Sequence, residues 1–136
     1  MKQNNKNFQE VLLAYINSFQ SLPMKARLDY FKDGQDDLVI NALGGGTIDK
    51  EFMDGTREVS LPFEVAVKSL SNQRASDTIW TINGDLSQPD IELPSTDNSY
   101  IFLSLDVSKP GINGKDEQGY FVYSMTLTAK LEITGG

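Results

Sequence analysis

Acidic side chains are the groups in this 136-residue chain whose types and spacing come closest to a metal-binding or reactive site. The densest group is Asp33-Gly34-Gln35-Asp36-Asp37. An EF-hand calcium loop places its glycine later and ends on a bidentate glutamate, and this segment has neither feature. We therefore predict a solvated turn here rather than a calcium site.

Two glycine-containing segments have part of the pattern of a phosphate-binding loop. The triplet 44–46 is followed by Thr47, without the Gly-Lys-Ser/Thr sequence that a P-loop needs. The segment 111–116 contains two glycines and a lysine, but Asp116 stands where a serine or threonine is required. Both segments are predicted to be turns, and we expect no bound nucleotide or other cofactor.

Histidine and cysteine do not occur in the chain. Their absence excludes Ser-His-Asp and Cys-His nucleophiles, ordinary zinc sites and an imidazole base. One class of enzyme stays open, a hydrolase that uses only carboxylates, and it would require two carboxyl groups facing each other in a cleft. We predict that the protein is not an enzyme and holds no metal.

The composition is that of a soluble globular protein, with 39% hydrophobic and 23% charged residues. We expect one domain over residues 1–136. The net charge is −7, and the twelve Lys and Arg residues are dispersed, which argues against nucleic-acid binding. The first seven residues lack the apolar region of a secretory signal, and no run approaches the roughly 18 apolar residues of a membrane span. We expect no membrane partner.

Two segments have the apolar spacing of amphipathic helices. Apolar residues at three- and four-residue spacing in 8–19 predict a helix over residues 6–21, which ends at Leu22-Pro23 because the residue before a proline disfavours the α region. Similar spacing, from Ala75 to Leu86, predicts a helix over residues 71–86.

Four further segments have the patterns of β-strands: 38–43, 58–68, 100–107 and 121–133. Pro62 cannot donate a ladder hydrogen bond, so we predict that its strand lies at a sheet edge or has a bulge. In the third strand, Ile101, Leu103, Leu105 and Val107 are expected to share one face. The last strand is long enough either to curve across the sheet or to reach beyond the domain under another chain.

These elements predict an α+β fold in the order α-β-β-α-β-β. A mixed or antiparallel sheet of four strands, or slightly more, would pack against the two helices. The connections 24–36 and 106–119 are predicted to be loops, and 44–57 a loop or a twisted hairpin tip, because they are rich in turn residues such as Asp33-Gly34 and Asn113-Gly114.

The whole pattern is similar to that of a known family. The passage from strand 61–69 into helix 75–86, the opening helix 8–19 and the closing strand 120–134 resemble the tail terminator, or minor capsid, proteins of long-tailed, siphovirus-type bacteriophages of Gram-positive bacteria. The resemblance covers nearly the whole chain and has no catalytic signature.

What the resemblance implies is a structural virion protein. It would form a homo-hexameric ring that caps the head-proximal end of the tail tube, stops tube polymerisation and joins the tail to the head. Its expected partners are copies of itself, the major tail tube protein, the head completion or connector protein, and passing DNA without specific binding. Assembly would take place in the cytoplasm of the host bacterium.

Candidate contact surfaces of such a ring are the outward face of strand 58–68 and the loops 44–57 and 106–119. The candidate contact residues are Glu58, Ser60, Glu64, Lys68, Lys109, Asn113, Lys115 and Asp116. Acidic walls would keep a passing polyanion from adhering to the channel. The candidate channel-lining residues are Asp33, Asp36, Asp37, Asp49, Glu51 and Asp54.

A second functional interpretation is also open. The protein could be a monomeric or dimeric adaptor, such as another head-tail connector or minor capsid component, that binds a partner strand at a sheet edge.

Overall fold

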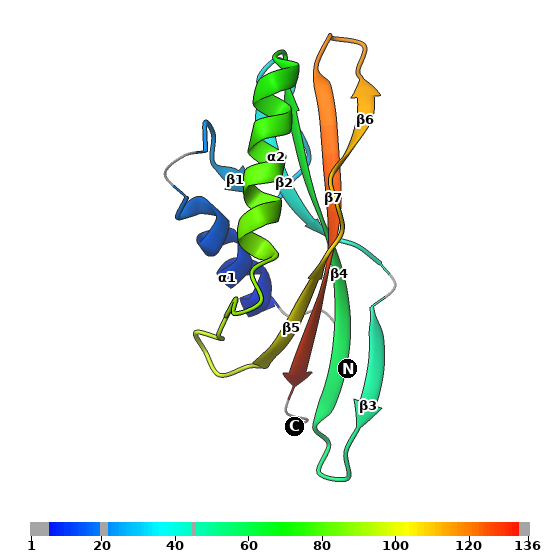
Figure 1. The fold of residues 1–136 in the computed structure, drawn as a ribbon. Helices are drawn as coiled ribbons and strands as arrows, with labels where there is room; N and C mark the ends of the chain where they lie inside the picture. Colours follow the sequence, from blue (N-terminus) through cyan, green and yellow to red (C-terminus); the bar gives the residue numbers. More distant parts are fainter. Residues whose placement is uncertain (1–5, 20–21, 45, 134–136) are drawn as a thin grey trace.

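A computed structural model describes residues 6–19, 22–44 and 46–133. Its elements follow the chain in the order α1 (Lys6–Asn17), β1 (Ala26–Arg27), β2 (Asp37–Ala42), β3 (Thr47–Glu51), β4 (Arg57–Ser69), α2 (Asn72–Leu86), β5 (Ile101–Val107), β6 (Gly111–Lys115) and β7 (Phe121–Ile133) (Figure 1). The α+β class is confirmed. The described residues form seven strands rather than four, because β1, β3 and β6 lie within segments that we predicted to be connections.

Strands β4 and β7 form the centre of the sheet. Each has 13 residues, and they pair in antiparallel register over their whole length, from Arg57 opposite Ile133 to Ser69 opposite Phe121. On the far side of β4 lie β2 and, further along, β3. On the far side of β7 lie β6 and β5. The sheet is mixed because β1 is parallel to β2.

Both helices pack on the same face of this sheet. The apolar residues of β4 that alternate toward this face, such as Phe63 and Val65, are buried together with Phe8 of α1 and Ile79 of α2. The ring centroids of Phe8 and Phe63 are 5.4 Å apart, a contact distance typical of aromatic pairs in protein cores. Neither described helix is long and apolar enough to cross a membrane.

The helix boundaries follow from local hydrogen bonds. The first helix ends at Asn17 rather than at residue 21, because the Asn17 side-chain amide both accepts from the backbone N–H of Ala26 (2.7 Å) and donates to its carbonyl (3.1 Å). The second begins at Asn72, because the Ser71 hydroxyl caps it by accepting from the Arg74 N–H. Four positions of the predicted segments lie outside the described residues: 20 and 21 of the helix 6–21, 45 of the loop 44–57, and 134 of the closing strand 120–134.

The prediction that Pro62 marks an edge strand or a bulge is wrong. Strand β4 is central, and its pairing with β7 has no register shift at Pro62, which lies opposite Thr128. The proline lies where the neighbour on the other side of β4 changes from β2 to β3, and its carbonyl accepts from the Leu43 N–H. Neither β2 nor β3 has a residue paired with Pro62. The missing N–H of the proline therefore interrupts neither the β2–β4 ladder nor the β3–β4 ladder.

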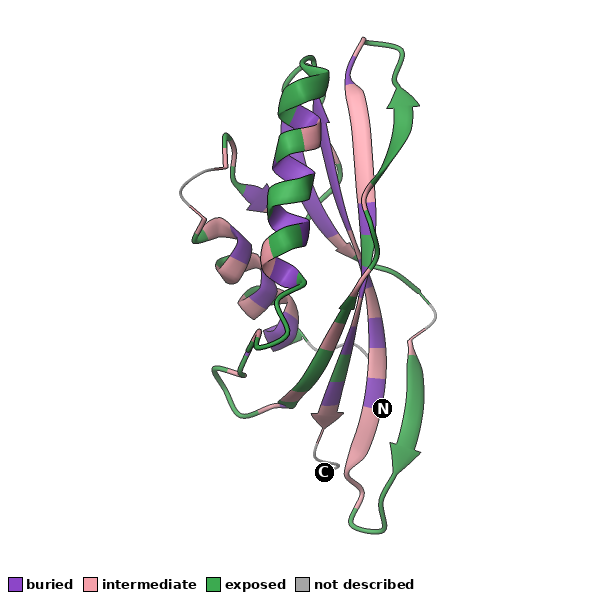
Figure 2. Cartoon of the chain, viewed as in Figure 1, coloured by how far each residue is buried: buried purple, intermediate pink, exposed green. Residues whose placement is uncertain are grey.

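The sheet extends beyond the helices at one end. We call residues 47–60, which form β3, its turn and the start of β4, the hairpin arm (Figure 1). All five residues of β3 are exposed, and Figure 2 shows this strand in the colour of exposed residues along its length. The turn is closed by the Phe52 N–H, which donates to the Thr56 carbonyl, and Gly55 adopts φ +89°, a conformation that favours glycine.

Candidate functional site

The candidate contact residues of β4 lie on the sheet face opposite the helices. Glu58, Ser60 and Glu64 are partly buried there, opposite Glu132, Lys130 and Thr126 of β7 respectively. Since β4 is central, these side chains can be reached only through the open face of the sheet and not along an edge.

Lys68 differs from the other three residues of this set. It is only 3% exposed, and its ammonium nitrogen lies over the rings of Tyr120 and Phe31, 4.7 Å and 5.4 Å from their centroids. A lysine ammonium at this distance from aromatic faces is held by cation–π attraction. The segment that contains Phe31 therefore covers this end of the open face.

The four candidate residues between β5 and β7 are exposed but have structural partners in three cases. Asn113 donates to the Ser124 hydroxyl (2.9 Å), and the Lys115 ammonium lies 5.1 Å from the centroid of the Phe121 ring. The Asp116 carboxylate accepts from the backbone N–H groups of Gln118 and Tyr120, both at 2.9 Å. These contacts shape the β6–β7 hairpin. Lys109 lies in the connection before it.

The structure does not bring the six candidate channel residues together. Asp33, Asp36 and Asp37 precede or begin β2, whereas Asp49, Glu51 and Asp54 belong to the hairpin arm. Asp37 lies opposite Lys68 near the end of β4, and Glu51 lies opposite Arg57 at its start. At the rise of a β-strand these two points are roughly 36 Å apart.

Asp37 is the buried partner in an ion pair with Arg27, whose side chain is 27% exposed. The Asp37 side chain is 4% exposed and pairs with the Arg27 guanidinium, while the backbone N–H of Lys32 donates to it at 2.8 Å. Burial is the largest influence on the Asp37 carboxyl and acts to raise its pKa. The hydrogen bonds from Arg27, Lys32 and Leu38 outweigh burial and hold that pKa below its usual range. Asp37 therefore joins β1 to β2.

Asp36, the residue before Asp37, also has a structural role. Its carboxylate accepts from the Ser69 hydroxyl (2.7 Å) and the Leu70 N–H (3.2 Å), and it pairs with Arg74 of α2 at 3.4 Å. These contacts hold the turn between β4 and α2. Asp33 is exposed in the turn that Gly34 closes with φ +75°.

The carboxylates of the hairpin arm are all exposed. A hydrogen bond from the Ser60 hydroxyl is the main reason that the pKa of Asp49 lies below its usual range. Backbone and side-chain hydrogen bonds from Thr56 lower the pKa of Asp54. Glu51 pairs with Arg57 at 2.9 Å, across the first pair of the hairpin. The lowered pKa values of Asp49 and Asp54 keep these two carboxylates negative at neutral pH.

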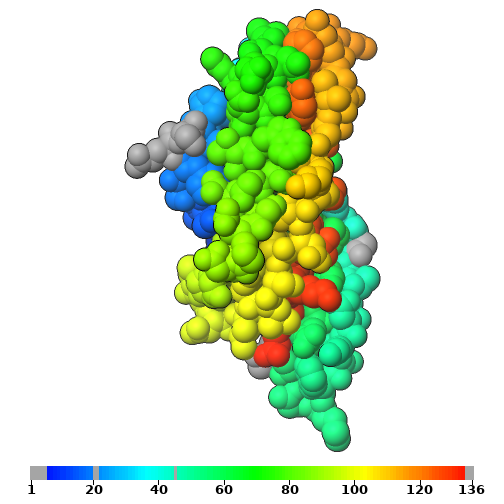
Figure 3. Space-filling view, in the orientation of Figure 1, coloured from blue at the N-terminus to red at the C-terminus, as the bar shows by residue number. Residues whose placement is uncertain are grey.

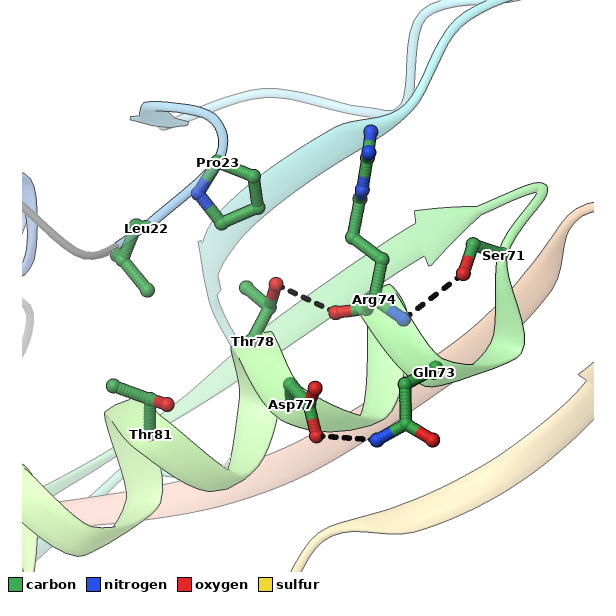
Figure 4. A pocket seen from close by; sticks show the side chains of 8 residues that line it. All are labelled: Leu22, Pro23, Ser71, Gln73, Arg74, Asp77, Thr78 and Thr81. Carbon is green, nitrogen blue, oxygen red and sulfur yellow. Dashed lines mark hydrogen bonds between the residues drawn. The ribbon is translucent and has the colours of Figure 1, made fainter.

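A groove of about 360 Å³ lies beside α2 (Figure 4). It is lined by Leu22, Pro23, Ser71, Gln73, Arg74, Asp77, Thr78 and Thr81. Asp77 is the single acidic residue among these, and it accepts from the Gln73 side chain at 2.8 Å. The groove thus lacks the two facing carboxyls of a carboxylate-only hydrolase. The described residues contain no group of three or more Asp or Glu that could hold a metal ion.

Sequence reasoning missed several exposed apolar side chains on the lower part of the sheet, where β3, the first half of β4, the second half of β7 and β5 lie side by side. The expectation that Ile101, Leu103, Leu105 and Val107 share one face is wrong, because a bulge between Phe102 and Ser104 shifts the register against β7. Ile101 is 55% and Leu103 is 42% exposed. At the tip of the hairpin arm, Met53 is fully exposed. Single exposed apolar residues are ordinary, but two in one edge strand are not.

Comparison with protein families identifies a match over most of the chain. Residues 15–133 match the model of a family described as bacteriophage tail terminator protein. The match begins inside α1 and ends at the last residue of β7, so it includes the hairpin arm and every strand. No curated protein matches the chain.

Proposed function

Because the chain belongs to the bacteriophage tail terminator family, whose members are structural virion proteins and not enzymes, we propose that it caps the head-proximal end of a phage tail tube. In this proposal six copies form a ring that stops tube polymerisation and joins the tail to the head. The observation that carries the proposal is the family match, which extends over nearly all of the described chain.

The shape of the sheet supports a ring. A ring requires a heterologous interface, in which one surface of each copy meets a different surface of the next. This chain offers two unlike sides: the hairpin arm beyond β4, and β5 with β6 beyond β7. The remaining surfaces would face the major tail tube protein and the head completion or connector protein. Glu58, Ser60 and Glu64, together with Lys109 and the β6–β7 hairpin, stay our candidates for the contacts with neighbouring copies and with these partners.

Passing DNA would meet acidic walls. The exposed carboxylates Asp49 and Asp54 belong to one projecting hairpin, which suits the lining of a channel that must not retain a polyanion. Asp36, Asp37 and Glu51 each form an ion pair with an arginine of the same chain, so their contribution to such a lining would be smaller. We further propose a long-tailed, siphovirus-type phage of a Gram-positive host, with assembly in the host cytoplasm.

Interrupting the gene in its phage tests the proposal. Without a terminator, tail tubes should continue to grow, so electron micrographs of lysates should show tails of variable and excessive length that are not joined to heads. Supplying the intact gene in trans should restore uniform tails. Tails of normal length joined to heads in the interrupted phage would contradict the proposal.

A protein-protein adaptor is the second candidate, and the exposed apolar side chains of β5 favour it. Native mass spectrometry distinguishes the two functions. A terminator should give a six-membered species, alone or after addition of tail tube protein. An adaptor should give one or two copies under both conditions.

A further inference from the structure

Strand β5 is an edge strand that lacks most of the usual protection against pairing with another chain. Natural edge strands carry lysine, proline, inward-pointing charges or β-bulges that block such pairing. The sequence of β5, Ile-Phe-Leu-Ser-Leu-Asp-Val, contains no lysine and no proline. Its Ile101 and Leu103 are exposed, and the yellow segment of Figure 3 that contains them lies at the surface. The bulge between Phe102 and Ser104 lies toward one end of β5, and residues 104–107 pair with β7 in regular register, so this part of the edge can accept another strand.

Strand β3 is the opposite edge of the same lower part of the sheet. There the strand order is β3-β4-β7-β5, and each neighbouring pair is antiparallel. Three successive reversals make β3 and β5 of one copy run in opposite directions. Two copies placed side by side in the same orientation therefore bring β5 of one against β3 of the next in the antiparallel sense.

We propose that β5 of each copy pairs with β3 of the next copy, so that the four-stranded lower sheets join into one continuous sheet. This inference rests on the ring of the proposed function and names the surface through which the ring closes. The two strands have seven and five residues, so β3 can pair along most of β5.

The side chains of β3 and β5 that would lie on the same face of the joined sheet are chemically compatible. Ile48 lies on the helix side of the sheet, opposite Val59, as Leu105 does opposite Ala129. On the other side, Lys50 lies opposite Glu58 and Asp106 opposite Thr128. A continuous sheet thus places apolar beside apolar residues on one face, and a lysine on the same face as an aspartate on the other. Both edges contain a bulge, which bends a strand and suits a curved, closing sheet.

The absence of cysteine from the chain permits a direct test by disulfide cross-linking. Lys50→Cys and Thr47→Cys place a thiol on the open face of β3, and Ser104→Cys and Asp106→Cys place one on the same face of β5. A β3 variant mixed with a β5 variant and oxidised should give a disulfide dimer that contains one chain of each. Neither variant alone should form it. A chain with one cysteine on each strand should give a ladder of multimers.

The matched control replaces the β5 cysteine with Thr81→Cys on the exposed side of α2, which should not cross-link to Lys50→Cys. Dimers formed by Ser104→Cys alone, at the level of the mixture, would show that β5 pairs with itself and would overturn the inference. A ring seen by native mass spectrometry without any β3–β5 cross-link would overturn the inference and leave the proposed function standing. A chain that stays single even with tail tube protein present would overturn both.

A second pair of variants tests the edge without cysteine. Ile101 of β5 and Ile112 of β6 are equally exposed, at 55% each. Ile101→Lys places a blocking charge on the proposed interface and should weaken self-association about tenfold, whereas Ile112→Lys should leave it nearly unchanged. Circular dichroism should show both variants folded. Undiminished assembly of Ile101→Lys, or equal loss in both, would contradict the β3–β5 pairing.

Discussion

The two ends of β4 lie in different surroundings although they belong to one strand. Near Ser69 the strand has β2 on one side, β7 on the other and both helices over one face, so Val65 and Val67 are completely buried. Near Arg57 it is part of the hairpin arm, where Ile48 on the same face of the sheet is 40% exposed. Burial here is decided by what covers the sheet and not by the pattern of the strand.

The difference separates residues that stabilise the chain from residues that are free to make contacts. Around the helices, buried side chains and the Arg27–Asp37 ion pair hold the elements together. In the hairpin arm, the described side chains are mostly exposed and could be changed with little loss of stability. Matched substitutions in the two regions can test this division.

The largest expected effect comes from a phenylalanine in each region. Phe63 is 1% exposed and packs against Phe8, whereas Phe52 in the arm is 44% exposed. Phe63→Ala should lower the free energy of unfolding by about 3–5 kcal/mol, since it leaves a cavity in the core. Phe52→Ala should cost less than about 1 kcal/mol.

Urea unfolding followed by the fluorescence of Trp80, which is the one tryptophan of the chain, measures both values. Equal losses for the two alanine variants would show that the hairpin arm is packed as tightly as the core, and the comparison would fail.

A smaller effect is expected at the Arg27–Asp37 ion pair. Asp37→Asn removes the charge that faces Arg27 and should lower the free energy of unfolding by roughly 2–4 kcal/mol. Asp33→Asn makes the same change of charge at an exposed position nearby and should be close to neutral.

The same ion pair predicts the direction of the pH dependence. The pKa of Asp37 is lower in the folded chain than in the unfolded one, so its stabilisation is complete above the unfolded value of about 4. It should be lost as the pH falls from there through the folded pKa. Urea unfolding at several pH values around that value of about 4 gives the free energy of unfolding as a function of pH. This free energy should decline less steeply toward acid pH for Asp37→Asn than for the unchanged chain. Parallel declines would exclude Asp37 as the cause.

The smallest effect is expected at the tip of the hairpin arm. Met53 is fully exposed, so Met53→Ser should change the free energy of unfolding by no more than about 0.5 kcal/mol. The measurement is again urea unfolding, at a concentration low enough to keep the chain single. A loss above about 1 kcal/mol would mean that the tip packs against the body of the protein.

The sequence allowed the long elements to be predicted because their patterns are strong. The apolar spacing of α2 and the alternation of β7 gave bounds within one residue of those observed. Strand β7 places every second residue against the core, and α2 places residues at three- and four-residue spacing against it. The short strands could not be found in this way, since β3 and β6 are exposed along their whole length and have no buried face to impose alternation.

Two errors had identifiable physical causes. Pro62 indicated an edge, but the structure tolerates it in a central strand because the neighbouring strands change at that point. Ile101 and Leu103 indicated a buried face, but one extra residue in β5 alters which side chains point to the core. A bulge depends on the partner strand, so the sequence of β5 alone contains no signal for it. The separation of the acidic residues into two groups likewise depends on tertiary structure.

The full-length pairing of β4 with β7 also has a mechanical consequence. Thirteen consecutive residue pairs connect the exposed end of the sheet to the helix-covered end. A load applied along these strands would act on many hydrogen bonds at once in shear, whereas the two-residue β1 could be peeled away pair by pair. Tension that reaches the hairpin arm from a neighbouring molecule would therefore be carried into the core without first unravelling the sheet.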